Sequence, residues 1–362
     1  MSTWLVTGGA GFIGCNFVRA ALDSTPHRVV VVDKLTYAGR TENLEAVASH
    51  PRYAFIRADI ADRAAVAAVF DAEQPSAVVN FAAESHVDRS IDGPAAFVQT
   101  NIVGAFELLE ASRELLARSG GERARRDFRF VQISSDEVYG SLGATGAFDE
   151  ASPLRPSSVY SASKAAAEHL VRAYCATFGV PGIVTNGSNN FGPHQLPEKL
   201  IPLTILNAIE GKPLPIYGDG GNVRDWLYVA DQCDAILRIL EHGRPGEKYN
   251  VGAGNERTNL EVVDAICDEL ERALPAARNA ALGHAGVTRY AELKQFVIDR
   301  PGHDRRYAVD ATKIRRELGW RPKLGFEARL RETIRWYLDN PRWCASVESD
   351  GSQRVRRGSP AA

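Results

Sequence analysis

A stretch of hydroxyl and carboxyl side chains at residues 134–140, Ser-Ser-Asp-Glu-Val-Tyr-Gly, directly follows the apolar run 128–133. An apolar run of this length is typical of a buried parallel strand, and such strands present functional side chains at their carboxyl ends. Two adjacent carboxylates are costly there, because like charges held close together resist joint ionisation. The stretch is a candidate for acid and base chemistry. The alternative is a solvated loop in which Asp136 caps a helix.

A second pair of reactive types, Tyr160 and Lys164, opens a segment with helical spacing that continues through Ala173. Residues at positions i and i+4 lie on the same face of a helix, so the ammonium is expected near the phenol. A nearby cation favours the phenolate, and we therefore expect Lys164 to lower the pKa of Tyr160 toward that of a general base. A Tyr-x-x-x-Lys pair alone is common on ordinary helices, so its meaning depends on the elements that precede it.

The chain begins with a strand, a glycine turn and a helix in immediate succession. Gly9, Gly11 and Gly14 have the dinucleotide spacing, in which missing side chains allow a tight turn and a close approach of backbone N–H groups to a pyrophosphate. A second apolar strand, 29–32, ends in Asp33. Its carboxylate is placed to accept hydrogen bonds from a ribose diol and would repel a 2′-phosphate, which predicts NAD rather than NADP. A plain helix cap or turn residue is the alternative for Asp33.

Strand and helix patterns then alternate through 53–60, 64–70 and 77–83. This alternation predicts an α/β fold with a Rossmann-type doubly wound parallel sheet. After residue 190 a polar, proline-bearing region breaks the rhythm, which predicts a smaller, interleaved substrate-binding domain. The predicted ranges are 1–190 with 225–252 for the dinucleotide domain, 191–224 with 253–345 for the substrate domain, and 346–362 for a disordered tail.

Composition limits the classes of partner. The 362 residues carry a formal net charge of -2, which gives no overall attraction to nucleic acid or acidic lipid, and no apolar run reaches the length of a membrane span. The arginine-rich segment 119–127 lacks interleaved aromatic residues, so a solvated loop is preferred to a nucleic-acid patch. Five cysteines without CxxC spacing indicate reduced thiols, and we expect a cytoplasmic protein without a metal site.

Together these motifs resemble the extended short-chain dehydrogenase/reductase superfamily that acts on nucleotide sugars. The Asp136-Glu137 pair, with segments 84–90, 189–190, 197–202 and 300–304, is similar to the dTDP-glucose 4,6-dehydratase family in particular. The similarity runs from about residue 3 to residue 344. It implies bound NAD, a nucleotide-sugar substrate and a homodimer. The apolar faces of helices 101–117 and 160–176 fit a dimer contact or packing inside one subunit.

The resemblance implies a conversion of dTDP-glucose to dTDP-4-keto-6-deoxyglucose by oxidation at carbon 4, elimination of water across carbons 5 and 6, and hydride return to carbon 6. Tyr160, assisted by Lys164, would take the proton of the carbon-4 hydroxyl, and Ser135 would hydrogen-bond the same oxygen. Glu137 would remove the carbon-5 proton. Asp136, kept protonated beside Glu137, would donate a proton to the departing carbon-6 hydroxyl.

The family's binding residues are carried over by position. The implied cofactor-binding residues are Gly8, Gly11, Phe12, Ile13, Gly14, Asp33, Lys34, Thr36, Asp59, Ile60, Ala82, Ala83, Tyr160 and Lys164. The implied substrate-binding residues are Ser85, Asn190, Glu198, Lys199, Tyr217, Arg224, Asn259, Arg300 and His303. Among these, Asn190 and Arg224 would contact the diphosphate and Tyr217 the base. An exposed ion pair is the alternative for Glu198 and Lys199, and a structural histidine is preferred for His86.

Other readings of the same motifs stay open. A UDP-sugar 4,6-dehydratase, a nucleotide-sugar 4-epimerase or a decarboxylase would keep the Tyr-Lys pair, but the epimerase and decarboxylase need no acid and base for elimination. A non-catalytic dinucleotide-binding regulator need not retain the reactive residues at all. The chain also departs from the family in places: Ser135 stands where the family usually has Thr, and Gly187 and Phe191 stand where it often has Cys and Tyr.

Overall fold

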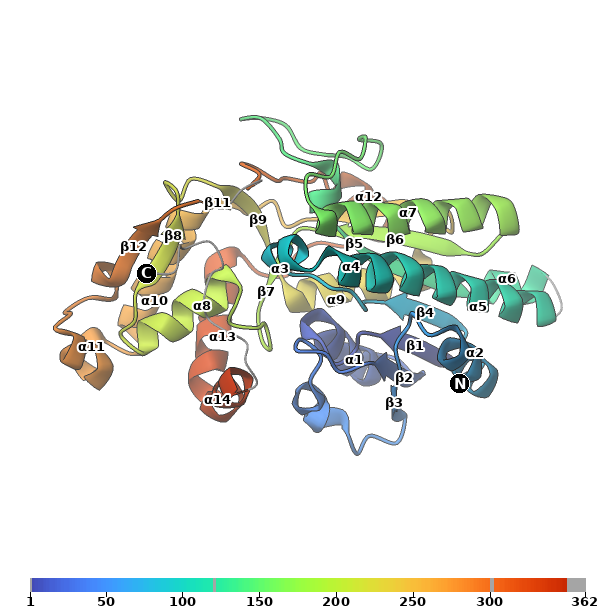
Figure 1. The fold of residues 1–362 in the computed structure, drawn as a ribbon, viewed down its shortest axis with the longest axis horizontal. Helices are drawn as coiled ribbons and strands as arrows, with labels where there is room; N and C mark the ends of the chain where they lie inside the picture. Colours follow the sequence, from blue (N-terminus) through green and yellow to red (C-terminus); the bar gives the residue numbers. More distant parts are fainter. Residues whose placement is uncertain (1, 120–121, 300–302, 350–362) are drawn as a thin grey trace.

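A parallel sheet forms the centre of the larger lobe in the computed structural model, which describes residues 2–119, 122–299 and 303–349 (Figure 1). In this part of the chain the sheet has seven strands in the order β10-β6-β5-β4-β1-β2-β3. All neighbouring pairs are parallel. The strands are β1 (Thr3–Thr7), β2 (Arg28–Asp33), β3 (Tyr53–Arg57), β4 (Ala77–Asn80), β5 (Arg129–Ser135), β6 (Gly182–Gly187) and β10 (Lys248–Val251). The predicted fold class is confirmed.

Helices cover both faces of this sheet, because alternate side chains of each strand point to opposite sides. Leu5 of β1 belongs to one buried apolar cluster, whereas its neighbours Trp4 and Val6 belong to another. The helices on the Trp4 side are α1 (Phe12–Ser24), α9 (Val229–His242) and α12 (Thr312–Leu318). Those on the Leu5 side are α2 (Arg63–Glu73), α5 (Gly104–Arg118) and α7 (Val159–Phe178).

The strand order reverses between β1 and β4, which pair with each other while the chain winds outward on either side. In doubly wound sheets, ligands bind outside the carboxyl ends of the strands at such a point. The glycine turn after β1, Asp33 at the end of β2 and the reactive stretch after β5 all leave the sheet at this edge.

A second lobe packs beside this edge and is built on two small sheets (Figure 1). One has the order β11-β9-β7, and the other pairs β12 with β8. The strands are β7 (Asn189–Phe191), β8 (Leu214–Tyr217), β9 (Val223–Tyr228), β11 (Glu256–Thr258) and β12 (Lys294–Val297). Its helices are α8 (Leu200–Ile209), α10 (Asn259–Ala273), α11 (Ala280–Ala285), α13 (Phe326–Asp339) and α14 (Pro341–Ser349). A separate apolar cluster joins these helices with β7, β8 and β9.

Short helical segments complete the described chain. They are η1 (Thr41–Val47), α3 (Val87–Asp92), α4 (Pro94–Phe97), η2 (Val98–Val103), α6 (Glu122–Asp127), η3 (Asp136–Tyr139), η4 (Ala276–Arg278) and η5 (Tyr290–Leu293). The segment η2 is a π-helical turn that leads into α5. No helix among residues 2–119, 122–299 and 303–349 is long and apolar enough to cross a membrane.

The chain returns from the second lobe to the central sheet through α9 and β10. The segment 225–252 was predicted to make this return, but β9 (Val223–Tyr228) pairs with β7 and β11 in the small sheet. The domain ranges themselves stay a prediction.

Part of the predicted tail, 346–362, is helical. Residues 346–349 belong to α14, in which Val347 is buried, because its side chain joins the apolar cluster of the second lobe. The rest of the predicted tail, 350–362, lies outside the described residues, as does Arg300.

Candidate active site

The glycine turn after β1 leaves no room for side chains. Gly8 has φ +68°, and a Cβ atom on it would lie 2.5 Å from the backbone nitrogen of Ala82. A Cβ on Gly14 would lie 2.2 Å from the carbonyl oxygen of Gly8. Glycine at these two positions therefore lets the turn pass close to β4 and lets α1 begin against the turn. The amino end of α1 faces the cavity described next, where its free N–H groups favour an anion.

Asp33 is held at the end of β2 by two backbone groups. The N–H of Ala10 donates to Oδ2 at 3.0 Å and the N–H of Leu35 donates to Oδ1 at 2.9 Å. These bonds use one lone pair on each oxygen and leave acceptor capacity for a diol. Burial raises the pKa of Asp33, while the two backbone bonds act in the opposite direction. Gly39 approaches this carboxyl so closely that a Cβ there would lie 2.5 Å from Oδ1.

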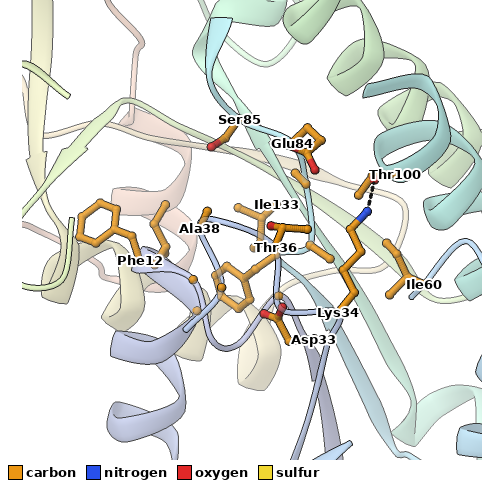
Figure 2. A pocket seen from close by; sticks show the side chains of 18 of the residues that line it. Phe12, Asp33, Lys34, Thr36, Ala38, Ile60, Glu84, Ser85, Thr100 and Ile133 are labelled. Atoms are coloured by element: carbon orange, nitrogen blue, oxygen red, sulfur yellow. Dashed lines mark hydrogen bonds between the residues drawn. The ribbon is translucent and has the colours of Figure 1, made fainter. Parts of the chain in front are cut away.

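One cavity brings together every residue predicted to bind the cofactor. Figure 2 shows part of its lining, in which Asp33 ends β2, Lys34 and Thr36 follow it, and Glu84 and Ser85 follow β4. Lys34 donates to the hydroxyl of Thr100 at 2.9 Å and lies 3.6 Å from a carboxylate oxygen of Asp59. The lining includes Gly8, Gly11, Phe12, Ile13, Gly14, Asp33, Lys34, Thr36, Asp59, Ile60, Ala82, Ala83, Tyr160 and Lys164.

The predicted catalytic residues form a buried cluster at the carboxyl end of β5. The hydroxyl of Ser135 donates to Oδ1 of Asp136 at 3.3 Å and also interacts with the phenol of Tyr160. The backbone N–H of Glu137 donates to the same hydroxyl at 3.2 Å. Ser135 is thus the residue that caps the helical turn η3, and the alternative in which Asp136 is a solvated cap is wrong because Asp136 is only 2 % exposed.

Asp136 and Glu137 differ in their surroundings. Burial raises the pKa of Asp136 to about 8, and the charge of Glu137 adds to the shift. The second oxygen of Asp136, Oδ2, is buried without a hydrogen-bond partner in the described structure. Glu137 lines a second cavity between the lobes. The pair can therefore hold one protonated and one ionised carboxyl group at neutral pH.

The sequence predicted that Lys164 lowers the pKa of Tyr160, but in the structure the pKa of Tyr160 is raised. Burial raises the pKa of Tyr160, and the charge of Glu137 raises it further, while the hydrogen bond with Ser135 opposes both. Lys164 is itself buried, which lowers its pKa to about 8. Its ammonium donates to the carbonyl oxygen of Ile133 at 2.8 Å. The expected lowering by Lys164 was wrong, because desolvation of the phenol and the nearby carboxyl groups of Glu137 and Asp136 outweigh the opposing hydrogen bond with Ser135.

The second cavity collects the described substrate-site residues. Its lining includes Glu137, Asn190, Glu198, Lys199, Tyr217, Arg224, Asn259 and His303. Ser85 lies in the first cavity, and Arg300 lies outside the described residues.

Glu198 and Lys199 line both cavities, so they mark where the two meet. Glu198 has a side chain only 8 % exposed, 3.6 Å from Arg89 and 3.9 Å from His86. The hydroxyl of Tyr37 donates to it at 3.4 Å. Lys199 instead donates to the carbonyl oxygen of Ser85 at 3.4 Å. The alternative of an exposed Glu198–Lys199 ion pair is wrong.

A cation and three aromatic side chains line part of the second cavity. The guanidinium of Arg224 lies 4.3 Å from the ring centre of Tyr307 and donates to the carbonyl oxygen of Asp304 at 2.9 Å. The rings of Tyr217 and His303 meet edge to face with centres 5.9 Å apart. This arrangement suits a phosphate beside the arginine and a planar group beside the aromatic rings.

Several lining residues were missed by the sequence analysis. Glu84 is held by Asn101, which accepts from its backbone N–H and donates to its backbone carbonyl. Gln195 lines both cavities, and its Oε1 is buried without a partner in the described structure. Tyr307 follows an irregular segment with no strand or helix signal. Glu84 alone had a visible signal, because it is the first charged residue after β4.

The sheet order, the glycine turn and the Ser-Tyr-Lys cluster define the class of extended short-chain dehydrogenases/reductases. A model of the GDP-mannose 4,6 dehydratase family matches residues 5–333. The chain is 55% identical to the dTDP-glucose 4,6-dehydratase of Neisseria meningitidis serogroup B, over 98% of both chains. The chain therefore belongs to the GDP-mannose 4,6 dehydratase family and, within it, to the dTDP-glucose 4,6-dehydratases. The predicted family is confirmed.

Solved structures agree with this assignment. The dTDP-glucose 4,6-dehydratase of Bacillus anthracis, in complex with NAD, is 43% identical and superposes with a TM-score of 0.83, covering 96% of this chain and 100% of that one. The enzyme of the same name from Streptomyces venezuelae, also with NAD bound, is 42% identical with a TM-score of 0.84, covering 95% and 99%.

Proposed function

We propose that this chain is an NAD-dependent dTDP-glucose 4,6-dehydratase, a lyase that converts dTDP-glucose to dTDP-4-keto-6-deoxyglucose. The observation that carries the proposal is the Asp136–Glu137 pair, in which burial keeps a proton on one carboxyl group beside a second carboxyl group that faces the substrate cavity. An elimination of water needs both a base and an acid. A 4-epimerase or a decarboxylase has no use for this pair.

NAD fits the first cavity on three grounds. The turn at Gly8 and Gly14 has no room for side chains, which allows a pyrophosphate to approach the amino end of α1, and Asp33 keeps acceptor capacity for a ribose diol. The same carboxylate opposes a 2′-phosphate by charge repulsion. When bound, NAD supplies a hydride acceptor and a positive charge close to Tyr160 and Lys164.

The residues of this chain then divide the work. Tyr160 takes the proton of the carbon-4 hydroxyl, and Ser135 hydrogen-bonds the same oxygen. With a ketone at carbon 4, the carbon-5 hydrogen becomes acidic and Glu137 removes it. Asp136 donates its proton to the departing carbon-6 hydroxyl, which leaves as water.

The proton count assigns Ser135 a further part. Glu137 returns its proton to carbon 5 when the hydride returns to carbon 6, so each turnover leaves one proton more on Tyr160 and one fewer on Asp136. Ser135 interacts with both groups, at 3.3 Å from Asp136, so its hydroxyl is placed to pass the proton back. The Ser in place of the family's usual Thr keeps this hydroxyl.

Substrate binding follows from the second cavity. Arg224 and Asn190 are proposed to bind the diphosphate, and Tyr217 with His303 to contact the base. Glu198 and Lys199 are proposed to line the sugar site, where the two cavities meet. Ser85 and Asn259 complete the described part of the site.

We also propose a homodimer. Val98 at the start of η2 and Val159 and Phe178 at the two ends of α7 are 46%, 37% and 42% exposed, and burial of such side chains favours association. Light scattering at several protein concentrations tests this, and a monomer at all of them would refute it. A cytoplasmic location and the absence of nucleic-acid partners stay predictions.

The activity is tested by incubation with dTDP-glucose and, separately, UDP-glucose. We expect the 4-keto-6-deoxy product, followed by its alkaline absorbance and by mass, from dTDP-glucose. Product from UDP-glucose alone would favour a UDP-sugar dehydratase. No loss of water from either sugar would overturn the dehydratase assignment.

The separate role of Glu137 is tested by Glu137→Gln. This change should lower the rate of elimination by roughly 10²–10⁴-fold, the usual contribution of a general base. Reduction of the bound dinucleotide, seen in the near-ultraviolet, should persist. Equal loss of both signals would contradict the division of labour.

A further inference from the structure

A buried carboxylate lies one helical turn beyond Lys164 on α7. The side chain of Glu168 is only 3 % exposed. Its Oε1 accepts hydrogen bonds from the hydroxyl of Ser134 on β5 and the side-chain amide of Asn186 on β6, each at 2.6 Å. The ammonium of Lys248 on β10 lies 2.8 Å from Oε2. Three neighbouring strands of the central sheet thus hold one carboxylate.

The position of this carboxylate relates it to Lys164. The two residues are separated by four positions and share a helix face. Lys164, which is only 4 % exposed, donates to the carbonyl oxygen of Ile133, and the next residue of β5, Ser134, donates to Glu168. In a site with so little water, the interaction between opposite charges is only weakly screened. Burial is the larger influence on Lys164 and destabilises its charged form, and the charge of Glu168 opposes it.

We propose that Glu168 is a positioning residue that keeps Lys164 protonated beside Tyr160, and that Lys248 weakens this effect by sharing the same carboxylate. The inference rests on the proposed function and adds that Lys164 acts there as an ammonium ion. Glu168 acts through Lys164 and belongs to neither of the two ligand cavities described above.

The charges around Glu168 come from several elements. The ionisable groups that interact with it or line the cavity on its outer side are Lys164, His169, Arg172 and Cys175 on α7, Tyr139 in η3, Glu150, Glu247, Lys248 and Lys313. Lys248 is paired with Glu168, whereas Lys313 donates to Glu247 at 2.6 Å. Lys313 therefore offers a matched control for the removal of Lys248.

The main test is Glu168→Gln, which removes the charge and keeps the shape. Lys164 should then lose its proton at a pH about one unit lower, an order-of-magnitude value for one buried charge. Two readouts report this. One is the affinity for NAD measured by calorimetry against pH, because an uncharged lysine in the cavity binds a dinucleotide anion less well. The other is the rate of dinucleotide reduction in a Glu137→Gln background, where the proton of Asp136 is not used.

Lys248→Met should move both profiles the other way, toward higher pH, because a positive charge that opposes the ammonium of Lys164 is gone. Lys313→Met should leave them unchanged. If Glu168 has only a structural role, Glu168→Gln should lower the free energy of unfolding. Glu168→Gln and Lys248→Met should then not shift the pH profiles in opposite directions. If Glu168→Gln does not fold, the comparison of Lys248→Met with Lys313→Met still decides.

The outcomes separate the two proposals. Opposite shifts in Glu168→Gln and Lys248→Met support the inference. Unchanged profiles, or shifts in the same direction, overturn it while leaving dehydration by the unmodified enzyme intact. Failure of the unmodified enzyme to dehydrate dTDP-glucose overturns the proposed function instead, and the NAD affinities still report on Glu168.

Discussion

Asp136 shows how burial, together with the charge of Glu137, distinguishes two neighbouring residues of the same chemistry. It and Glu137 differ by one methylene group, but Asp136 is inside the protein and Glu137 faces a cavity. Adjacency predicts that the two carboxyl groups do not both ionise. Which of them keeps the proton depends on burial, and burial at a strand end follows from packing that a sequence pattern does not contain.

Asp136→Asn is expected to abolish elimination and to make the protein more stable at high pH. Its folded-state pKa of about 8 lies above the ordinary aspartate value of 3.8, so the folded protein holds an extra proton between these values and loses stability as the pH rises through them. The asparagine variant has no such loss. We therefore compare the free energy of unfolding of the variant with that of the unmodified enzyme. The difference should favour the variant by on the order of a few kcal/mol more at about pH 9 than at about pH 5. Denaturant unfolding at both pH values measures this, and elimination should be lost. An equal stability difference at both values would contradict the buried proton.

The role of the Ser135 hydroxyl can be tested with two substitutions, one that removes the hydroxyl and one that keeps it. Ser135→Ala removes the hydroxyl that interacts with Asp136 and Tyr160, and kcat should fall by roughly 10²–10⁴-fold. Ser135→Thr restores the family's usual residue, whose methyl group restrains the rotamer, and should retain or raise kcat. Steady-state kinetics on dTDP-glucose distinguishes them. A large loss in both variants would indicate that this position is limited by space and not by the hydroxyl.

At the scale of elements, the central sheet was predictable because its strands are continuous apolar runs separated by helical spacing. The glycine turn, Asp33 at the end of its strand and the Tyr-x-x-x-Lys pair can each be recognised in a short stretch of sequence, so they were predicted as well. The missed residues Gln195 and Tyr307 come from irregular segments of the second lobe, and they reach the cavities only through tertiary packing. The helical residues 346–349 were assigned to the tail for a similar reason, since they are held by tertiary packing of one buried valine, Val347.

Gly39 is a further position where the elements meet too closely for a side chain. An added Cβ would lie 2.5 Å from Oδ1 of Asp33, so Gly39→Ala should displace the carboxylate from the end of β2. The affinity for NAD should fall by about tenfold or more, equivalent to ~1.4 kcal/mol. Gly143→Ala is the control, because a Cβ there meets no atom within 4 Å. Calorimetry with NAD would contradict the argument if both variants bound equally.

At the scale of the whole molecule, the two lobes are joined behind the glycine turn. The side-chain amide of Asn43 donates to the carbonyl oxygen of Ala10 at 2.8 Å, and its oxygen accepts from the indole N–H of Trp343 on α14 at 2.8 Å. Arg40 also donates to the hydroxyl of Ser346 at 3.2 Å. The last described helix thus supports the loop that lines the cofactor cavity.

Trp343→Phe should weaken NAD binding as well as stability. It leaves the buried oxygen of Asn43 without its donor, at a cost of about 1–3 kcal/mol, and loosens the bond to Ala10. Trp336→Phe is a matched control, because Trp336 packs against Trp343 with ring centres 5.0 Å apart in the same aromatic cluster. The midpoint temperature of thermal unfolding should fall in both variants, but the NAD affinity should fall only in Trp343→Phe. Equal NAD affinities in the two variants would show that the hydrogen bond between Asn43 and Trp343 does not affect the glycine turn.

The bond between Asn43 and Trp343 has a consequence for the order of events during protein synthesis. Ala10 and Asn43 leave the ribosome when most of the chain is still untranslated, and Trp343 emerges about 300 residues after Asn43. The first βαβ unit can fold early, but the support behind its glycine turn is complete only when translation is almost finished. A nascent chain arrested before Trp343 should therefore capture NAD poorly, and full capture should coincide with the emergence of α14.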